Sequence, residues 1–344
     1  MKEKLRWGLI ATGSASEAFI VGLKQSTTGE ALAVGSRTQA AADAFGEKHA
    51  IPRRYGTYQA LLDDPDIDVV YIATPHPMHL EWAVKAAQAG KHILVEKPIG
   101  MNEREAAAMI HAARRHDVFL MEAFVFRCHP QFRMLGRLIG EGAIGEVRIV
   151  QASLGFSTRQ GPEGRYFSRA LGGGGILDVG CYSVAAARLI AGLAAGKDFD
   201  EPVEVKGCAQ LGPTGVDVWA VAALKFPGGI LAQLAASILV NLRPENAVRV
   251  YGSEGAIIMP SPWHPGQRYS PPASISVRRR GEKQPREIAI DAPLDIFAYE
   301  ADVVSANIAR RQAREMSWDD TLGNMRALDR WRAEVGLQFE ADGE

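Results

Sequence analysis

Residues 69–97 read VVYIATPHPMHLEWAVKAAQAGKHILVEK and hold the pattern that decides the fold. The apolar run at 69–73 has the length and β-branched content of a buried strand, and residues 78–89 are spaced as a helix. Gly90 follows as a helix stop, and residues 92–95 form a second apolar run. A strand, a helix and a strand in this order predict a βαβ unit with parallel strands.

The same alternation extends to both sides of this unit. Strand-like runs occur at residues 5–11, 31–35 and 118–123, and a further helical pattern covers residues 103–116. Repeated βα units predict an N-terminal α/β domain, residues 1–125, with a doubly wound parallel sheet and helices on both faces.

The pattern changes after residue 125. Residues 129–141 are spaced as a helix, and two more helical segments fall within residues 295–335. Short strand-like runs separated by Gly-rich or Pro-containing turns favour an antiparallel sheet; they lie at 146–155, 203–211, 216–226, 230–239, 247–251 and 274–279. We therefore expect residues 126–344 to form an α+β domain with an open, mainly antiparallel sheet.

Composition narrows the class of protein. The 344 residues are 47% hydrophobic and 23% charged, and 39 Lys and Arg against 40 Asp and Glu leave a net charge of −1. This balance gives no electrostatic reason to expect nucleic acid or an anionic membrane as a partner. The three cysteines form no CxxC pair, which argues against a disulfide framework or structural zinc. The apolar stretch at residues 183–196 is too short to span a bilayer, so a soluble, cytoplasmic protein is predicted.

The turn after the first strand reads Gly-Leu-Ile-Ala-Thr-Gly-Ser-Ala-Ser over residues 8–16. Aligned with the GxGxxG fingerprint, it keeps the second glycine, Gly13, but has Ala11 and Ser16 at the other two positions. The second glycine lets the backbone approach a pyrophosphate at a helix N-terminus. We expect a dinucleotide here, or otherwise an ordinary strand–helix turn; the predicted cofactor-binding residues are Thr12, Gly13, Ser14 and Ala15.

The second strand ends at Ser36 and Arg37, where an NAD-specific enzyme usually places a carboxylate on the adenosine ribose. An arginine can pair with a 2′-phosphate instead. This chemistry favours NADP, with NAD possible; the alternative is a solvated arginine at a strand end.

Two further strand ends carry candidate residues at the same sheet edge. Thr74, Pro75 and His79 follow one strand, and we prefer a loop and helix start there to a metal site, so no metal is predicted. Glu96 and Lys97 end the next strand, where the lysine charge can polarise a hydroxyl or carbonyl oxygen; alternatively they form a surface turn. All five are predicted to contribute to the cofactor site.

Residues 171–182 read LGGGGILDVGCY. Four consecutive glycines let the backbone pass close to a ligand or another chain segment. If a helix begins directly after them, Asp178 and Tyr182 lie on one helix face. A carboxylate and a phenol presented together suit proton transfer; the alternative is a flexible loop with a half-buried tyrosine.

Three motifs together resemble the glucose–fructose oxidoreductase / inositol dehydrogenase / MocA family: Glu96-Lys97-Pro98, the run MEAFVFRCHPQ at residues 121–131, and GGILDVGCY at residues 174–182. The resemblance extends over nearly the whole chain. Within this family the chain is most similar to one branch, because that branch has Tyr, as at Tyr182, where many relatives have His. The branch contains dimeric dihydrodiol dehydrogenases, NADP-dependent xylose dehydrogenases and glucose–fructose oxidoreductase.

The resemblance implies a Rossmann domain and a homodimer or homotetramer formed through the second sheet. It also implies that Lys97 and Tyr182 are the catalytic pair, with Asp178 beside them. The chain departs from the pattern at Ala11 and Ser16. It also does not show the leader expected of the periplasmic glucose–fructose enzyme.

We therefore expect hydride transfer between nicotinamide and a hydroxyl-bearing carbon of a sugar or polyol, with Tyr182 taking the hydroxyl proton. Free tyrosine has a pKa of about 10, so a nearby Lys97 ammonium and the nicotinamide charge must stabilise the phenolate. Weaker candidates for the substrate wall are Arg127, Arg165, Tyr166, Trp219 and Trp263, with His264 a comparable guess.

Three other functions compete with this one. A trans-dihydrodiol dehydrogenase or dicarbonyl reductase would use the same catalytic pair. A non-catalytic NADP-binding sensor would not need Lys97, Asp178 and Tyr182 together. A pure carbohydrate-binding protein would leave the βα-repeat domain unexplained.

Overall fold

The structure, a computed structural model, describes residues 4–267 and 270–343. The chain forms two compact units: the first contains the chain up to Gly100, Arg104–Cys128 and Pro293–Thr321, and the second contains Met101–Glu103, His129–Ala292 and Leu322–Glu344. The division into domains 1–125 and 126–344 stays a prediction, to which the structure adds that the late segment Pro293–Thr321 packs with the first unit.

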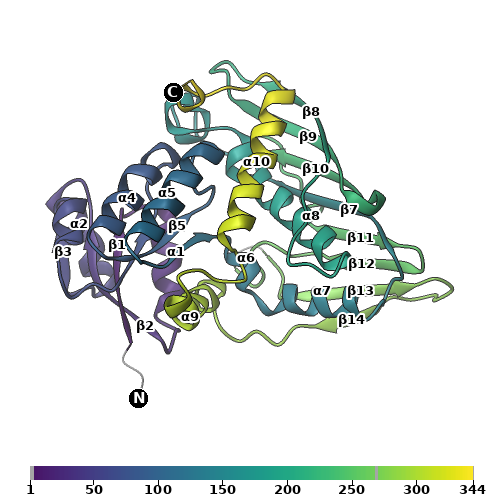
Figure 1. Cartoon of the computed structure of the whole chain (residues 1–344), viewed down its shortest axis with the longest axis horizontal. Coiled ribbons are helices and arrows are strands. Elements are labelled where there is room, and N and C mark those ends of the chain that lie inside the picture. The colour runs from purple at the N-terminus through teal and green to yellow at the C-terminus, as the bar shows by residue number, and fades with distance from the viewer. Residues whose placement is uncertain (1–3, 268–269, 344) are drawn as a thin grey trace. The chain divides into compact units, whose positions relative to one another are not determined.

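The first unit is built on a six-stranded parallel sheet with the strand order β3-β2-β1-β4-β5-β6 (Figure 1). This is the order of doubly wound dinucleotide-binding sheets, so the predicted fold class is confirmed. All residues of β4 and β6 and the last four residues of β1 are buried, as expected for a parallel sheet covered on both faces. The strands are β1 (Leu5–Ile10), β2 (Gly29–Gly35), β3 (Arg53–Tyr55), β4 (Val69–Ile72), β5 (His92–Glu96) and β6 (Leu120–Ala123).

The helices of this unit follow the predicted alternation. Gly22 allows the late helix α9 to pack closely against α1, because a Cβ at this position would lie 2.5 Å from the Cβ of Phe297 in α9. The helices are α1 (Ser14–Leu23), α2 (Gln39–His49), α3 (Tyr58–Leu62), α4 (His79–Gln88), α5 (Glu103–Arg115), α6 (Val125–Cys128) and α9 (Ile296–Asn307).

The second unit contains an eight-stranded sheet in the order β14-β13-β12-β11-β7-β10-β9-β8. Among the strands that the structure describes in this sheet, only β7 and β10 pair in parallel, so the prediction of a mainly antiparallel sheet is confirmed. Within residues 4–267 and 270–343, the short strands β3, β12 and β14 were not predicted. The strands are β7 (Val147–Gly155), β8 (Glu204–Leu211), β9 (Asp217–Lys225), β10 (Leu231–Ser237), β11 (Val248–Gly252), β12 (Gly255–Met259), β13 (Ser274–Arg279) and β14 (Arg286–Ala289).

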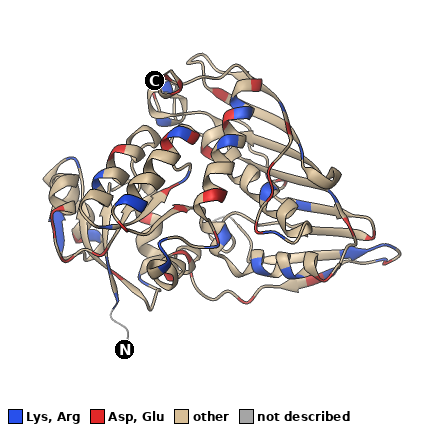
Figure 2. Cartoon of the chain, in the orientation of Figure 1, with Lys and Arg blue, Asp and Glu red and all other residues tan. Residues whose placement is uncertain are grey.

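Helices cover one face of this sheet. Helices α7 (Pro130–Gly140) and α8 (Cys181–Ala194) lie in front of the strands in Figure 1, and α10 (Trp318–Glu334) follows near the end of the chain. A π-helical turn, Ile176–Gly180, leads directly into α8. Basic and acidic residues are interspersed along both units (Figure 2), which agrees with the net charge of −1.

The apolar helix is longer than predicted. The helical run Arg169–Ala194 is long and apolar enough to cross a membrane by length and composition, but 94% of its apolar window is buried inside the fold. Arg188 within it is fully buried and pairs with Glu201 at 2.6 Å. These features are those of a core helix.

Candidate functional site

The turn after β1 has an unusual backbone. Ala11, at the first glycine position of the fingerprint, has φ +84°, a conformation that favours glycine. Ser16, at the third glycine position, is fully buried, and its hydroxyl donates to the Ala11 carbonyl at 2.8 Å. The turn therefore forms without these two glycines, because the Ser16 hydroxyl donates a hydrogen bond to the carbonyl that the turn exposes.

The N-terminus of α1 is left open to a ligand. Gly13 is the N-cap and provides no side-chain hydrogen bond to the first backbone N–H groups of the helix. A Cβ on Gly13 would meet no protein atom within 4 Å. In contrast, Thr38 and Thr57 cap α2 and α3 with their hydroxyls. Uncapped N–H groups beside open space fit an anionic group such as a pyrophosphate.

The end of β2 carries the predicted specificity residues. The Ser36 hydroxyl is buried and lies 3.3 Å from the Thr12 hydroxyl, which ties the ends of β1 and β2 together. Arg37 is exposed, and no ion pair joins it to a carboxylate within residues 4–267 and 270–343. This guanidinium is available for a phosphate.

His79 joins two loops of the first unit. Its Nε2 lies 2.9 Å from the Thr74 carbonyl, and its Nδ1 lies 3.0 Å from the Pro98 carbonyl. Complete burial lowers the pKa of His79 to about 4, against the raising effect of these carbonyls. The ring is therefore neutral and has one N–H, which donates to one of these carbonyls while the ring lies between the β4 loop and the loop after β5. Any direct role of His79, Thr74 or Pro75 toward a cofactor stays a prediction.

Glu96 and Lys97 are half-buried at the end of β5. One Glu96 carboxylate oxygen accepts a hydrogen bond from the buried Tyr71 hydroxyl, and the other accepts from the Lys97 backbone N–H at 3.2 Å. Glu300 on α9 is fully buried, and burial together with the Glu96 charge raises its pKa well above the ordinary value. The hydrogen bonds of Glu96 with Tyr71 and with the Lys97 backbone therefore hold the turn that carries Lys97.

In the second unit, the π-helical turn presents Asp178. Its buried carboxylate accepts a hydrogen bond from the Arg165 guanidinium at 3.0 Å. The Arg165 guanidinium also lies 4.4 Å over the Tyr166 ring. Burial lowers the pKa of Arg165, but the Asp178 charge and the Tyr166 side chain raise it above its ordinary value overall. The structure therefore brings together three residues that were predicted separately.

Tyr182, in the first turn of α8, lies among aromatic rings. Its ring centroid is 5.8 Å from that of Trp263 in an edge-on arrangement, and 5.8 Å from that of His264. Trp263 is held in turn by a hydrogen bond from its indole N–H to the Ser153 carbonyl at 2.9 Å. Phenol, indole and imidazole rings therefore pack together at this helix start, with Tyr182 and Trp263 buried.

Two further residues that were predicted for the substrate wall have surroundings of their own. Arg127 is buried inside the first unit, where its guanidinium pairs with Asp320 at 2.7 Å. Trp219 on β9 is 46% exposed, whereas its neighbours Val218 and Ala220 are buried. Side chains alternate along a strand, so Trp219 points to the face opposite that of Val218, which packs with Phe167. The roles of Arg127 and Trp219 toward a substrate stay predictions.

Sequence reasoning missed two supporting residues. Ser16 was treated as a lost glycine, although a small hydroxyl at that position can bond the turn. Asp217, the first residue of β9, is fully buried and accepts a hydrogen bond from the backbone N–H of Ile176 at 2.7 Å. Its short run, Thr-Gly-Val-Asp, is typical of an ordinary turn, so only the strand pairing could have singled it out.

Comparison with known proteins places the chain in a family. Residues 5–124 match the oxidoreductase family with an NAD-binding Rossmann fold, and residues 132–258 match the GFO/IDH/MocA C-terminal domain. A trans-1,2-dihydrobenzene-1,2-diol dehydrogenase from Danio rerio is 38% identical over 75% of each chain. An uncharacterized oxidoreductase from Rhizobium meliloti is 31% identical over 94% of this chain and 95% of its own.

Solved structures agree with this placement. An aldose-aldose oxidoreductase from Caulobacter crescentus, complexed with glycerol, has a TM-score of 0.85 and 27% identity and covers 99% of both chains. A 3-ketoreductase from Actinomadura kijaniata, in complex with NADP and TDP-benzene, has a TM-score of 0.84 and 28% identity over 97% of this chain and 98% of its own. The chain therefore belongs to the GFO/IDH/MocA family and is an NAD(P)-dependent oxidoreductase.

Proposed function

We propose that this oxidoreductase transfers hydride between NADP and a hydroxyl-bearing carbon of a sugar or polyol, with Tyr182 and Lys97 as the proton-transfer pair. The observation that carries the proposal is the cluster at the start of α8, where Arg165 pairs with Asp178 and Trp263 lies against Tyr182. Charged donors and acceptors suit sugar hydroxyls, and aromatic rings suit the apolar face of a sugar ring.

The residues of the chain have separate tasks in this reaction. The nicotinamide supplies the hydride acceptor when it is bound. Tyr182 takes the substrate hydroxyl proton during oxidation, and the Lys97 ammonium stabilises the negative charge on oxygen. Asp178, held by Arg165, accepts a hydrogen bond from a substrate hydroxyl and orients it. Structures of lysine and tyrosine variants of the Actinomadura ketoreductase exist in complex with NADP, and they motivate the same pair here.

NADP is proposed as the preferred cofactor. The α1 N-terminus and Gly13 would hold the pyrophosphate, and Arg37 would pair with the 2′-phosphate. The absence of a carboxylate at positions 36 and 37 removes the group that NAD-specific enzymes use for the ribose. NAD would still bind through the pyrophosphate contacts, but more weakly.

A second substrate class is a trans-dihydrodiol or a dicarbonyl compound. The relative from Danio rerio, at 38% identity, is named for trans-1,2-dihydrobenzene-1,2-diol. The aromatic surroundings of Tyr182 would accept such a flat ring. The same proton-transfer pair serves both substrate classes.

The assay that tests the function offers the purified protein NADP or NAD together with a panel of aldoses, inositols and trans-dihydrodiols. Absorbance at the reduced-nicotinamide band is followed. A rise with NADP and one aldose or polyol is expected. A rise with dihydrodiols only would select the second class. NADP binding without turnover of any compound would contradict the proposed substrate classes, in favour of an untested substrate or a sensor.

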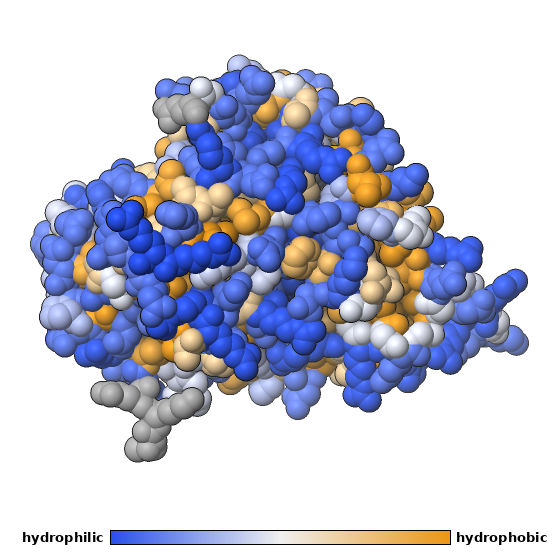
Figure 3. All heavy atoms as spheres, in the orientation of Figure 1, coloured by the Kyte–Doolittle hydropathy of each residue, from blue (hydrophilic) through white to orange (hydrophobic). Residues whose placement is uncertain are grey.

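We also propose that the protein is a cytoplasmic homodimer or homotetramer assembled through the open face of the large sheet. Apolar side chains on this face are exposed, among them Ile149, Trp219, Val221 and Leu231 at 43%, 46%, 52% and 49%. The surface visible in Figure 3, on the helix side of the sheet, is mainly hydrophilic with scattered hydrophobic groups. Light scattering on Val221→Glu tests the assembly: a shift to monomer is expected, and an unchanged mass would contradict it.

A further inference from the structure

Asp217 lies directly against the glycine-rich turn that precedes Asp178 and Tyr182. Its side chain is fully buried at the start of β9. One carboxylate oxygen, Oδ2, accepts a hydrogen bond from the Ile176 N–H at 2.7 Å. Ile176 is the first residue of the π-helical turn that continues into α8, so the carboxylate lies at the N-terminal end of this turn, where an anion is favoured.

The glycine turn has no room for another side chain beside this carboxylate. Gly174 has φ +113°, and a Cβ there would lie 2.3 Å from the other Asp217 oxygen, Oδ1. A Cβ on Gly175 would lie 3.2 Å from Oδ2. The two glycines and the carboxylate therefore fit each other closely, and the turn takes its course around Asp217.

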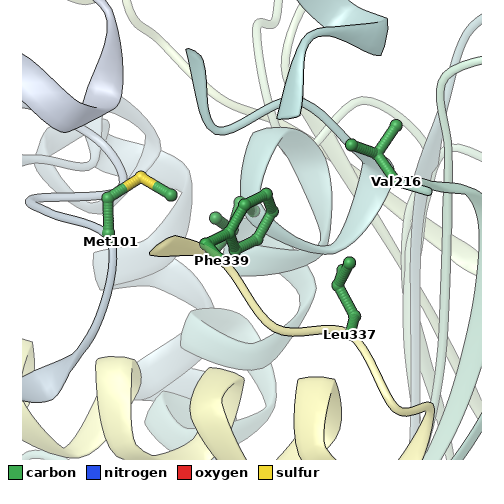
Figure 4. Close-up of a cluster of buried hydrophobic side chains, with 5 residues drawn as sticks. Met101, Val216, Leu337 and Phe339 are labelled. Carbon is green, nitrogen blue, oxygen red and sulfur yellow. The ribbon is translucent and has the colours of Figure 1, made fainter. Parts of the chain in front are cut away.

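Apolar packing fastens the same two segments together. Leu177, next to Asp178, and Val216, next to Asp217, belong to one buried cluster. Met101, Leu337 and Phe339 complete the cluster, and Figure 4 shows Phe339 between Met101 and Leu337 with Val216 nearby. The position of Asp217 relative to the catalytic turn is thus held by hydrogen bonding on one side and by packing on the other.

Burying this carboxylate has a cost. Desolvation raises the pKa of Asp217 to about 7, against the lowering effect of the Ile176 and Gly175 N–H groups and of the Arg332 charge. Oδ1 has no hydrogen-bond partner within the described part of the chain. An apolar residue at this position would avoid the cost, so the placement of the group calls for a reason beyond stability.

We propose that Asp217 is a positioning residue that sets the direction of the turn carrying Asp178 and Tyr182. This inference rests on the proposed function of these two residues. Asp217 touches neither substrate nor cofactor; it acts through the Ile176 backbone. Loss of the carboxylate lets the turn relax, so the reacting groups are misplaced while cofactor binding by the first unit is unchanged.

The test compares Asp217→Ala and Asp217→Asn with Asp200→Ala. Asp200 is a buried aspartate of the same unit that accepts a hydrogen bond from the Glu201 N–H at 3.0 Å and pairs with Lys197 at 3.4 Å. For each variant, kcat, KM and the Kd for NADP are measured on the substrate found in the panel assay. Hydrogen exchange of the peptide 174–182 is followed in parallel.

A misplacement of about 1 Å costs on the order of 100-fold in rate, so Asp217→Ala is expected to lose about that much kcat with an unchanged Kd for NADP. Asp217→Asn keeps an acceptor oxygen and loses less. Both variants exchange faster at Ile176, and Asp200→Ala keeps the wild-type kcat. If Asp217→Ala does not fold, Asp217→Asn decides: faster exchange with lowered kcat supports the inference.

Wild-type kcat in a folded Asp217 variant whose turn exchanges faster would overturn the inference, as would equal losses in Asp200→Ala. Tyr182→Phe, measured on the same substrate, separates the two levels. If Tyr182→Phe is inactive while the Asp217 variants are fully active, only the positioning role fails. If Tyr182→Phe retains turnover, the proposed function itself fails.

Discussion

Gly13 and Gly174 lie in the two turns on which the proposed chemistry depends, and they are glycines for different reasons. A Cβ on Gly13 would meet no protein atom within 4 Å, whereas a Cβ on Gly174 would lie 2.3 Å from the Asp217 carboxylate. The space beside Gly13 is empty in the protein and is what a cofactor needs. The space beside Gly174 is already filled by the protein itself.

Under the proposed function, the difference separates a glycine that a cofactor would require from a glycine that the fold requires. Substitution in the first turn should impair binding and leave stability unchanged. Substitution in the second should impair stability and the geometry of the residues that follow. Substitutions in each turn and the pH dependence of the free energy of unfolding test this contrast.

The pH dependence of the free energy of unfolding tests the cost of burying the Asp217 carboxylate beside the second turn. An aspartate whose pKa is raised from 3.8 to about 7 in the folded state is favoured there in its neutral form, so folding stability falls as pH rises between these values. Wild-type protein should lose up to about 4 kcal/mol over this range relative to Asp217→Asn. Urea unfolding of both proteins at a series of pH values measures the difference; parallel pH curves would refute it.

Gly174→Ala should destabilise the second unit. The left-handed backbone and the clash with Asp217 together are expected to lower the free energy of unfolding by about 3 kcal/mol. Gly161→Ala is the matched control, since a Cβ there would meet nothing within 4 Å. Denaturant unfolding of both variants checks the prediction, and equal stability of the two would show that the turn can move aside.

Gly13→Val should leave the free energy of unfolding unchanged and weaken NADP binding. The added side chain fills the approach to the α1 N-terminus, for which we expect about a 100-fold increase in the Kd, or about 2.7 kcal/mol. Calorimetric titration with NADP measures the Kd, and thermal unfolding without cofactor serves as the control. An unchanged Kd would place the pyrophosphate elsewhere.

Arg37→Ala should weaken the binding of NADP more than that of NAD. Loss of a charge-assisted pair with the 2′-phosphate is expected to raise the Kd for NADP by about tenfold. NAD has no 2′-phosphate, so its Kd on the same variant is the internal control. If both Kd values rise equally, Arg37 contributes to the adenine or to the fold rather than to the phosphate.

The first turn was more readable from sequence than the second because its determinants are close together. The alternation of apolar runs and helical spacing predicted β1 to β6 except β3, whose three residues are too few to form a pattern. Gly13 and Arg37 could be placed because they follow strand ends directly. The Ser16 bond to Ala11 spans five residues and was still missed, since the fingerprint describes glycines and not their substitutes.

The second turn could not be predicted in full because its support comes from a distant strand. Asp217 and Ile176 are 41 residues apart, and only the pairing and burial of β9 bring them together. Trp219 illustrates a related point: its residue type suits a sugar, but strand alternation directs it to the open sheet face, and its place in the substrate wall stays a prediction. Residue type suggests a role, whereas the register of a strand decides which face a side chain occupies.

The most direct test of the central claim is the single-turnover rate of hydride transfer in wild-type protein, Lys97→Met and Tyr182→Phe. Each protein is saturated with NADP and with the substrate found in the panel assay. General acid–base catalysis contributes about 100- to 10,000-fold, so a rate loss in that range is predicted for both variants, with an unchanged Kd for NADP. A wild-type rate in Tyr182→Phe and Lys97→Met would contradict the assignment of this pair.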